Sequence, residues 1–418
     1  MEPDKPKSIW LSHPTGNTFV RALLDSISRS GRSFSFFTTL GVAESSRWPG
    51  LLPGKLRAEI ERRAYRVPPE RLVTWPAIEI GRLLAARMGW RRALRHETGW
   101  FCVDAVYRRL DDKVAARLRR AREADLPRVA YAYEDGALGT FLAARERGAR
   151  RVYELPIAYW ETSRRLLREE AARLPEWEPT LQATRDSEAK IERKRRELEE
   201  AEAVVCPSQF VLDSLPEGIR RIKKCIVAPF GSPGEGLKGP GAPKDAGRPF
   251  RFLFAGSMSQ RKGLADLFEA AKLLRDRRFE LVVMGSPVAP LEFYRRQLAD
   301  FVHEPTRPHS GVMKLMASCD VLVLPSIVEG RALVQQEALS QGLPLIVTAN
   351  AGGEDLIEEG RTGFLVPIRS PASIAEKMAW FLDHPSELEG MKDAAREMAA
   401  ARTWLDYGSK ILDLTDSL

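Results

Sequence analysis

The sequence predicts an α/β protein of two domains, each organised around its own parallel β-sheet. Its 418 residues are enough for two or three domains. Short apolar segments alternate with helix-compatible segments along both halves of the chain, which is typical of parallel sheets. Several of the apolar segments lack polar alternation, so we expect both faces of each sheet to be covered. A stretch rich in glycine and proline separates the two series.

The first half opens with a strand, helix and strand in succession. The strand KSIWLS is followed by the turn HPTGN, a helix that ends at Gly31, and the strand SFSFFTTLG. Residues 50–125 are expected to be helical and strongly basic. Further strands are predicted within 127–138, 151–160, 203–208 and 223–231, with helix-compatible sequence from 161 to 203.

The second half repeats the alternation after the segment 232–249, which is the predicted linker. We therefore expect a first domain at 1–231, a second at 250–400 and a final helical segment at 401–418. The predicted strands of the second domain are FRFLFAGS, FELVVMGS, DVLVLPS, LPLIVTA and GFLVP. In such sheets ligands bind beyond the carboxyl ends of the strands, so we expect the site in a cleft between the two domains.

The composition favours an acidic partner and a reducing compartment. The net charge is +8, from 65 basic and 57 acidic residues, which suits nucleotide phosphates, anionic lipids or nucleic acid, although an arginine-rich composition alone would also explain it. The four cysteines are scattered, so neither a zinc site nor a disulfide framework is expected. No signal peptide or membrane-spanning segment is evident, and we expect a cytoplasmic location.

Glu329 and Glu337 follow an apolar strand at the expected start of a helix. Eight helical residues would place them about 12 Å apart, too far for the carboxylate pair of a glycoside hydrolase. That separation suits an elongated ligand with a sugar at one end and a ribose at the other. The backbone amides between them would then face a diphosphate: Gly330, Arg331, Ala332 and Leu333. The alternative is that Glu329 caps the helix and Glu337 faces solvent.

Arg261 and Lys262 lie between a strand that ends at Gly256 and the next helix. Two cations at the start of a helix oppose its dipole, so the pair favours a bound anion such as phosphate. A solvent-exposed pair is the alternative.

Two positions of the first half are further candidates. Gly16, in the turn HPTGN, would let a loop approach a ligand, or would only form the turn. Asp135 follows Glu134 at the end of a strand and would either cap the next helix or act on the acceptor or the reacting sugar.

Taken in order, several of these motifs resemble the carboxyl-terminal domain of retaining glycosyltransferases of family four. They are GSMSQRKG, Pro325 and Ser326, the pair Glu329 and Glu337, ALSQGLPLIVTANAGGEDLI and GRTGFLVP. The first half is similar to the family more loosely, through SHPTGN and YELPIAYW. The resemblance implies the GT-B fold, in which two Rossmann-like domains face a central cleft and the last helix, here 401–418, crosses back to the first domain.

The resemblance also implies an activity. Such enzymes move a sugar from a nucleotide-sugar donor to an acceptor hydroxyl with retention, by front-face displacement and without a metal or other cofactor. The second domain would hold the donor, and the first would hold a glycan, a lipid-linked glycan or a small molecule. Lys262 resembles the lysine that neutralises the diphosphate, Glu329 the residue that contacts the transferred sugar, and Glu337 the residue that binds ribose.

The chain departs from the family pattern at two places. Ser257 stands where arginine is common, so Arg261 would supply the second cation. EGRA replaces EGFG, so Arg331 would contact a phosphate or a charged donor sugar. The expected catalytic residues are Lys262, Glu329 and Asp135. The expected donor-binding residues are Gly16, Gly256, Arg261, Lys262, Glu329, Arg331, Ala332, Leu333 and Glu337, with no metal ligand.

Other functions remain open at this stage. A phosphorylase or a nucleotide-sugar epimerase would share the fold, and a non-catalytic basic protein would bind membranes or polyanions. The segment GRLLAARMGWRRALRHETGW (81–100) mixes arginine with leucine, methionine and tryptophan. It would lie on the inner face of a membrane, or form a solvated basic helix on the core. No aromatic-plus-basic RNA motif is present, so no nucleic acid partner is expected.

Overall fold

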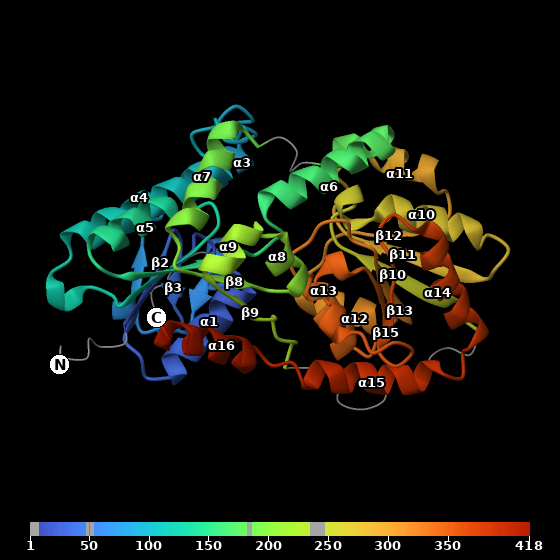
Figure 1. Ribbon diagram of the computed structural model, residues 1–418. Coiled ribbons are helices and arrows are strands. Elements are labelled where there is room, and N and C mark those ends of the chain that lie inside the picture. The colour runs from blue at the N-terminus through green and yellow to red at the C-terminus, as the bar shows by residue number, and fades with distance from the viewer. Residues whose placement is uncertain (1–7, 47–49, 51–53, 182–185, 235–246) are drawn as a thin grey trace.

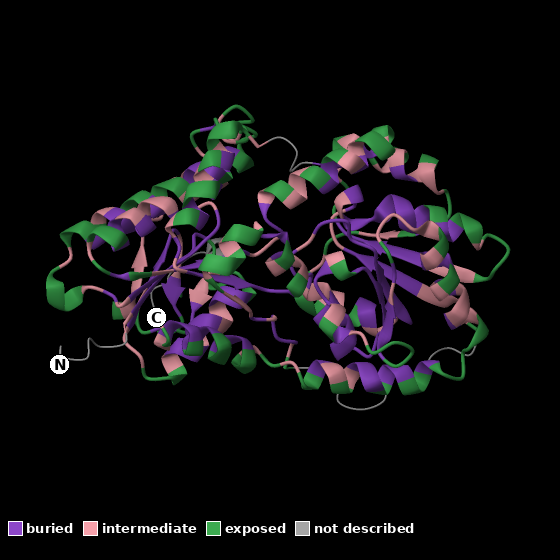
Figure 2. Cartoon of the chain, in the orientation of Figure 1, coloured by how far each residue is buried: buried purple, intermediate pink, exposed green. Residues whose placement is uncertain are grey.

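The computed structural model describes residues 8–46, 50, 54–181, 186–234 and 247–418. Figure 1 shows two α/β domains side by side, each with a sheet between layers of helices. Figure 2 shows that the sheets are buried, whereas the outer faces of the helices are exposed. Most of the predicted linker, from 235 to 246, lies outside the described residues.

The first domain contains a seven-stranded sheet in which all neighbouring strands are parallel. Its order is β5-β2-β1-β6-β7-β8-β9. The strands are β1 (Ile9–Ser12), β2 (Phe34–Thr38), β5 (Leu72–Thr74), β6 (Val129–Tyr133), β7 (Arg150–Glu154), β8 (Ala203–Cys206) and β9 (Lys224–Val227). A separate parallel pair joins β3 (Val42–Ala43) and β4 (Ala64–Tyr65). Every residue of β1, β6 and β8 is buried, as their continuous apolar sequence predicts.

Nine α-helices of the described chain precede the second sheet. They are α1 (Thr18–Arg29), α2 (Gly54–Glu61), α3 (Ala77–Arg87), α4 (Val103–Arg120), α5 (Leu138–Glu146), α6 (Trp160–Arg173), α7 (Glu188–Glu200), α8 (Gln209–Ser214) and α9 (Glu217–Ile222). Short 3₁₀ helices are η2 (Pro69–Arg71), η3 (Glu123–Asp125) and η4 (Pro175–Thr180).

The expectation that residues 50–125 are helical is wrong for β4, for the loop between α3 and α4, and for β5, which pairs with β2. Prolines lie on both sides of this strand, at Pro68, Pro69 and Pro76. A residue that precedes proline is disfavoured in the helical conformation, so this stretch is held extended.

The second domain contains a six-stranded parallel sheet in the order β12-β11-β10-β13-β14-β15. The strands are β10 (Phe250–Ala255), β11 (Phe279–Met284), β12 (Val302–Glu304), β13 (Val321–Leu324), β14 (Leu345–Val347) and β15 (Gly363–Leu365). The helices are η6 (Gln260–Lys262), α10 (Leu264–Leu273), α11 (Leu291–Gln297), α12 (His309–Ala317), α13 (Leu333–Ser340), η7 (Ala349–Ala351), η8 (Glu354–Leu356), α14 (Pro371–Asp383) and α15 (Leu388–Ala400).

The last helix, α16 (Trp404–Asp416), returns to the first domain, where it packs against α1 (Figure 1). A capping box between Thr403 and Asp406 starts this helix. Its apolar side chains Ile411 and Leu412 enter the core beneath the first sheet. Two parallel α/β domains with a returning final helix confirm the predicted fold class.

A segment that precedes the linker also packs against the second domain. Trp177 of η4 is buried in the core of the second domain, with its ring 5.0 Å from that of Phe293. The carboxylate of Glu170 on α6 accepts hydrogen bonds from Gln260 and Arg369 of the second domain. Residues 160–180 therefore pack on the second domain, which the predicted division at residue 231 does not anticipate. Among the described helices, none combines the length and apolar character needed to span a bilayer.

Candidate functional site

The loops that follow the strands of the two sheets meet at Gly330. The hydroxyl of Ser208, after β8, donates to the carbonyl oxygen of Gly330 at 2.7 Å. The amide of Ala158, after β7, donates to the carbonyl oxygen of Glu329 at 3.4 Å. A Cβ atom on Gly330 would lie only 1.8 Å from the carbonyl oxygen of Pro156, so glycine is needed for this approach. The carboxyl ends of both sheets thus face one interdomain site.

Glu329 lies at the centre of this site between two cations. Its carboxylate is 2.6 Å from Nζ of Lys262 and 2.7 Å from Nη1 of Arg261. Both cations come from η6, which ends at Gly263 in the left-handed conformation with φ of 75°. A Cβ atom on Gly263 would lie 2.0 Å from the carbonyl oxygen of Pro325, so η6 packs directly against the end of β13. The sequence prediction that these three charged residues share one site agrees with this geometry.

The charges of this cluster do not cancel. Burial lowers the pKa of Lys262, and the nearby carboxylate of Glu329 opposes that effect. Burial would raise the pKa of Glu329, but the charges of Lys262 and Arg261 outweigh it and hold this pKa below its usual value. Two cations and one ionised carboxylate leave one excess positive charge in a largely buried place, which favours an anionic ligand.

The side chain of Lys262 passes close to Gly256 at the end of β10. A Cβ atom on Gly256 would be 3.4 Å from Cε of Lys262, in contact with the lysine side chain. A Cβ atom on the neighbouring Gly285 would lie 1.8 Å from the carbonyl oxygen of Gly256. The two glycines therefore allow the strand ends to lie close together beside the cationic cluster.

The expected continuous helix from Glu329 to Glu337 is wrong, because α13 begins only at Leu333. Ala332 has extended backbone angles, and its amide donates to the carbonyl oxygen of Ala351 at 3.1 Å. The separation of the two glutamates is therefore not set by the rise of a helix. Glu337 lies on α13, with a carboxylate oxygen 3.5 Å from Nδ1 of His309. Burial raises the pKa of Glu337, and His309 opposes that shift.

Three of the four expected anion-binding amides lack an acceptor. The amide of Ala332 donates to the carbonyl oxygen of Ala351 and cannot bind an anion, so that part of the prediction is wrong. The amides of Gly330, Arg331 and Leu333 make no hydrogen bond to other residues in the described parts of the chain. They are available to a ligand beside Glu329.

Arg331 does not face this site with its side chain. The buried guanidinium donates to both carboxylate oxygens of Asp355, at 2.6 and 3.2 Å, and to the carbonyl oxygen of Gly352 at 2.9 Å. The structure therefore gives the Arg331 side chain a role in joining two loops of the second domain, instead of the expected contact with a phosphate or charged sugar.

On the first domain, Gly16 has a structural reason to be glycine. Its φ is 57°, and a Cβ atom there would lie 2.3 Å from the ring of Tyr65. Its amide and that of Thr15 donate to Nδ1 of His13, at 2.9 and 3.1 Å. Burial lowers the pKa of His13 to about 3, so this histidine is neutral with its proton on Nε2. Sequence reasoning quoted the motif but missed His13, which no metal or catalytic spacing singled out.

The alternative that Asp135 caps a helix is wrong. α5 begins at Leu138, and the amides of Gly139 and Thr140 donate to the carboxylate of Asp111, each at 2.7 Å. Asp135 has φ of 72°, and its carboxylate accepts a hydrogen bond from Arg193 at 3.0 Å.

Asp135 belongs to a buried ionic network that sequence reasoning missed. Lys194 lies 3.4 Å from Glu134 and 3.8 Å from Asp135, and Lys190 lies 3.0 Å from Asp104. Burial raises the pKa of Glu134 to about 7, with Lys194 opposing the shift. The basic residues recur at helical spacing in KIERKRRELEE, which is a signal for one charged face of α7.

A small cavity of about 70 Å³ lies between the domains beside this network. Its lining includes Trp160, Arg164, Asp186, Lys194, Arg261 and Val328. A larger cavity of about 870 Å³ lies at the amino ends of β1 and β2, near Ser8 and Ser33. We assign the site to the small cavity and its surroundings, because the cationic cluster adjoins it.

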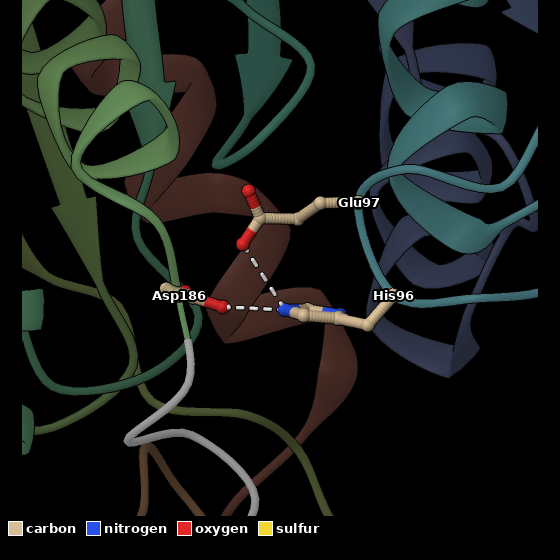
Figure 3. A group of neighbouring side chains, drawn as sticks. All are labelled: His96, Glu97 and Asp186. Atoms are coloured by element: carbon tan, nitrogen blue, oxygen red, sulfur yellow. Dashed lines mark hydrogen bonds and ion pairs between the residues drawn. The ribbon is translucent and has the colours of Figure 1, made fainter.

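His96, Glu97 and Asp186 form the one group of described residues with spacing suited to a metal ion (Figure 3). Nε2 of His96 is 3.0 Å from Asp186 and 3.2 Å from Glu97. Lys190 already lies 3.1 Å from Asp186, and the amide of Ser187 donates to Glu97 at 2.9 Å. The contacts fit a clasp that joins the loop after α3 to the start of α7, and we call it the His96 clasp.

Comparison with known proteins finds similarity in the second domain. Residues 242–398 match the family model described as glycosyl transferases group 1. The chain is 32% identical over 166 residues to a D-inositol 3-phosphate glycosyltransferase of Paenarthrobacter aurescens, an alignment that covers 37% of this chain and 41% of the relative. The matched region makes up less than half the length of the first curated relatives.

Solved structures match over both domains. Sucrose-phosphate synthase from Thermosynechococcus elongatus superimposes with a TM-score of 0.67 and 16% identity, over 98% of each chain. HepE of Anabaena in complex with UDP-glucose gives a TM-score of 0.60 at 15% identity, over 98% of this chain and 100% of that one. These similarities show that the fold is GT-B.

Proposed function

We propose that this chain, whose carboxyl-terminal domain belongs to the glycosyl transferases group 1 family, is a retaining glycosyltransferase. It moves a sugar from a nucleotide-sugar donor to a hydroxyl group of a glycan, a lipid-linked glycan or a small molecule. The observation that carries the proposal is the buried cluster of Arg261, Lys262 and Glu329, which holds one excess positive charge at the carboxyl ends of the strands.

The donor diphosphate is assigned to this cluster. The Lys262 and Arg261 side chains and the amides of Gly330, Arg331 and Leu333 would surround its oxygens. UDP-glucose is the first donor to test, since the similar HepE structure contains it. Glu337, on the helix that follows these amides, is assigned to the hydroxyls of the donor ribose.

The reaction is proposed to depend on electrostatic stabilisation of the leaving group. As the glycosidic bond breaks, negative charge grows on the departing nucleoside diphosphate, and Lys262 and Arg261 stabilise it. A phosphate oxygen then accepts the proton of the attacking acceptor hydroxyl on the same face of the sugar, so the configuration is retained. Because two cations of the chain supply the positive charge, we propose that no metal ion is required.

Glu329 is assigned to the hydroxyl groups of the transferred sugar. Its carboxylate is held by the two cations, which fixes its position beside the expected diphosphate. Asp135 is held by Arg193, so we assign it to shaping the acceptor side and not to proton transfer.

The location is proposed to be cytoplasmic. Cys102, Cys206, Cys225 and Cys319 are all free thiols in the structure. Such thiols are compatible with a reducing compartment.

Calorimetry with UDP-glucose, in buffer that contains a chelator, tests the donor site and the metal independence together. We expect saturable binding of UDP-glucose and of UDP, and release of UDP when an acceptor is added. Proton NMR of the product then reports its anomeric configuration. Binding of no nucleotide sugar from a panel of UDP, GDP, ADP and dTDP donors would contradict the proposal, and an inverted product would contradict the mechanism.

A further inference from the structure

The surface formed by α3 and the loop that follows it exposes unusually many apolar side chains. Six of the ten exposed large apolar residues of the described chain lie between residues 80 and 103. Trp100 is 80% exposed and Trp90 is 54% exposed. The six residues, which we call the α3 surface, are Ile80, Leu84, Met88, Trp90, Trp100 and Val103. Concentration of this kind marks an interaction surface, whereas single exposed apolar residues do not.

The apolar residues of α3 form one stripe. Ile80, Leu84 and Met88 are spaced by four residues, so they lie on the same face of the helix and of its carboxyl-terminal turn. A helix that packs on a core buries such a stripe, but here the buried residues are Glu79 and Ala85. The apolar face of α3 is therefore turned away from the first domain.

Positive charge without a partner surrounds this stripe. Arg87, Arg91, Arg92 and Arg95 are exposed, and within the described residues no carboxylate or carbonyl group is bonded to their guanidinium groups. The acidic side chains nearby already have other partners, since Glu79 binds Arg82 and Glu97 belongs to the His96 clasp. Arginines on other helices typically have partners, as Arg195 does with Glu192 and Glu199. The arginines around the α3 surface therefore have no bonded partner among the described residues and can bind anions.

Short contacts hold the loop after α3 in place. The ring of Phe101 packs against Gly81, where a Cβ atom would lie 2.3 Å from Cε1. The amide of Phe101 donates to the carbonyl oxygen of Ala93 at 2.9 Å. The His96 clasp fixes the same loop to α7 (Figure 3). The exposed tryptophans are thus presented by an ordered scaffold, which lowers the entropic cost of binding.

We infer that the α3 surface binds the interface of a bilayer that contains anionic lipids. Tryptophan favours the headgroup region, while the stripe on α3 suits the boundary between headgroups and acyl chains. The unpaired arginines suit lipid phosphates, and each basic residue near an anionic surface contributes about 1 kcal/mol. This combination of two tryptophans, an aliphatic stripe and free arginines favours a lipid surface over an acidic protein.

The His96 clasp connects the loop that carries the α3 surface to the lining of the interdomain cavity. Asp186 takes part in the His96 clasp and also lines the small cavity between the domains. In Figure 1, α3 and its loop stand next to the start of α7, at the top of the first domain. Membrane binding would therefore leave the cavity close to the lipid surface.

Co-sedimentation of the full chain with vesicles tests the inference without any nucleotide sugar, so its outcome is independent of the proposed reaction. We expect binding to vesicles of phosphatidylcholine mixed with phosphatidylglycerol, weaker binding as salt is added, and little binding to phosphatidylcholine alone. The double variant Trp90→Ser/Trp100→Ser should lower the partition coefficient at least tenfold. The double variant Arg87→Ser/Arg91→Ser should lower it roughly 25-fold, about fivefold for each charge.

Matched controls come from exposed residues elsewhere. Ile222→Ser/Leu273→Ser removes apolar residues that are also exposed, and Arg275→Ser/Arg278→Ser removes exposed arginines of the second domain. Both controls should bind vesicles as the unchanged protein does, and all variants should keep the same melting temperature. Equal binding by the α3 and control variants would overturn the inference. Conversion of a dimer to a monomer by the tryptophan variant, without vesicle binding by either form, would overturn it in favour of self-association.

Discussion

The hydroxyl group of Tyr407 lies 2.9 Å from a carboxylate oxygen of Glu154, although 253 positions of the chain separate the two residues. Tyr407 is on α16, and Glu154 ends β7 at the edge of the first sheet that faces the cleft. Both side chains are almost completely buried. The returning helix is therefore attached to the first domain by a buried polar contact as well as by apolar packing.

Replacement of Tyr407 by phenylalanine should destabilise the protein. The change removes one donor from the buried carboxyl group of Glu154 and keeps the aromatic packing against Phe230. Loss of a buried hydrogen-bond partner costs about 1–3 kcal/mol. Urea unfolding should show a lower midpoint. Tyr107→Phe is the control, because in the described structure its hydroxyl has no hydrogen-bond partner, and an equal effect of both changes would contradict the role of Tyr407.

The same pair predicts a dependence of stability on pH. Burial raises the pKa of Glu154 to about 7, whereas its ordinary value is 4.5. The folded protein keeps this proton in the interval between those values while the unfolded chain loses it, so the contribution of Glu154 to stability falls as pH rises from 4.5 to 7. The difference corresponds to roughly 3 kcal/mol.

Glu154→Gln checks the sign of that dependence. Glutamine cannot ionise, so the variant should be more stable than the unchanged protein above pH 7 and should lose this advantage toward pH 4.5. Thermal unfolding across this range measures the difference. A variant whose stability follows that of the unchanged protein at every pH would show that Glu154 is not the responsible group.

Much of the fold could be predicted because buried parallel strands need continuous apolar sequence. That requirement identified β1, β10, β13 and β14 directly from the chain. The strands β5 and β12 contain no fully buried residue, so neither requires a continuous apolar sequence that would reveal it. The position of α6 and η4 on the second domain could not be predicted either. An amphipathic helix reveals which face it buries, but not the domain that covers that face.

Part of the candidate site could also be predicted from the sequence. The order of motifs indicated that Arg261, Lys262 and Glu329 belong to one site, and local sequence pointed to a helix near Glu337. The pairing of Arg331 with Asp355 depends on loops 24 residues apart, so no local pattern reveals it. The bond between Ala332 and Ala351, which delays the start of α13, is also a tertiary contact.

Lys262→Ala should slow sugar transfer strongly and change donor affinity less. The change removes the excess positive charge of the cluster. Arg261 is then the one cation left beside Glu329, and their two charges cancel. Removal of one group that stabilises developing charge costs about 10²–10³ in kcat. Steady-state kinetics with UDP-glucose separate kcat from KM. Lys272→Ala is the control, since this exposed lysine of α10 pairs with Glu269 on the same helix, and equal rates in both variants would remove Lys262 from the mechanism.

Glu337→Gln should instead weaken donor binding. In the proposed complex its carboxylate accepts hydrogen bonds from ribose hydroxyls, and hydrogen bonds to a charged group contribute about 1.5–3 kcal/mol. We expect the Kd for UDP, measured by calorimetry, to rise roughly tenfold to a hundredfold. The Kd for inorganic phosphate should not change, which distinguishes loss of a ribose contact from damage to the diphosphate site. An unchanged Kd for UDP would place the ribose elsewhere.

Gly330→Ala should open the contact between the domains. The added methyl group would lie 1.8 Å from the carbonyl oxygen of Pro156, so the two loops must separate. Separation would lengthen the hydrogen bond from Ser208 to residue 330 and move the amides of the donor site away from the first domain. We expect UDP binding to change little, because the cluster around Glu329 stays within the second domain. The rate of sugar transfer should fall, since the acceptor side and the donor side no longer meet.

Gly390→Ala, where a Cβ atom meets no neighbour within 4 Å, is the matched control. If Gly330→Ala transfers sugar as fast as that control, the contact between these loops is not needed for the reaction.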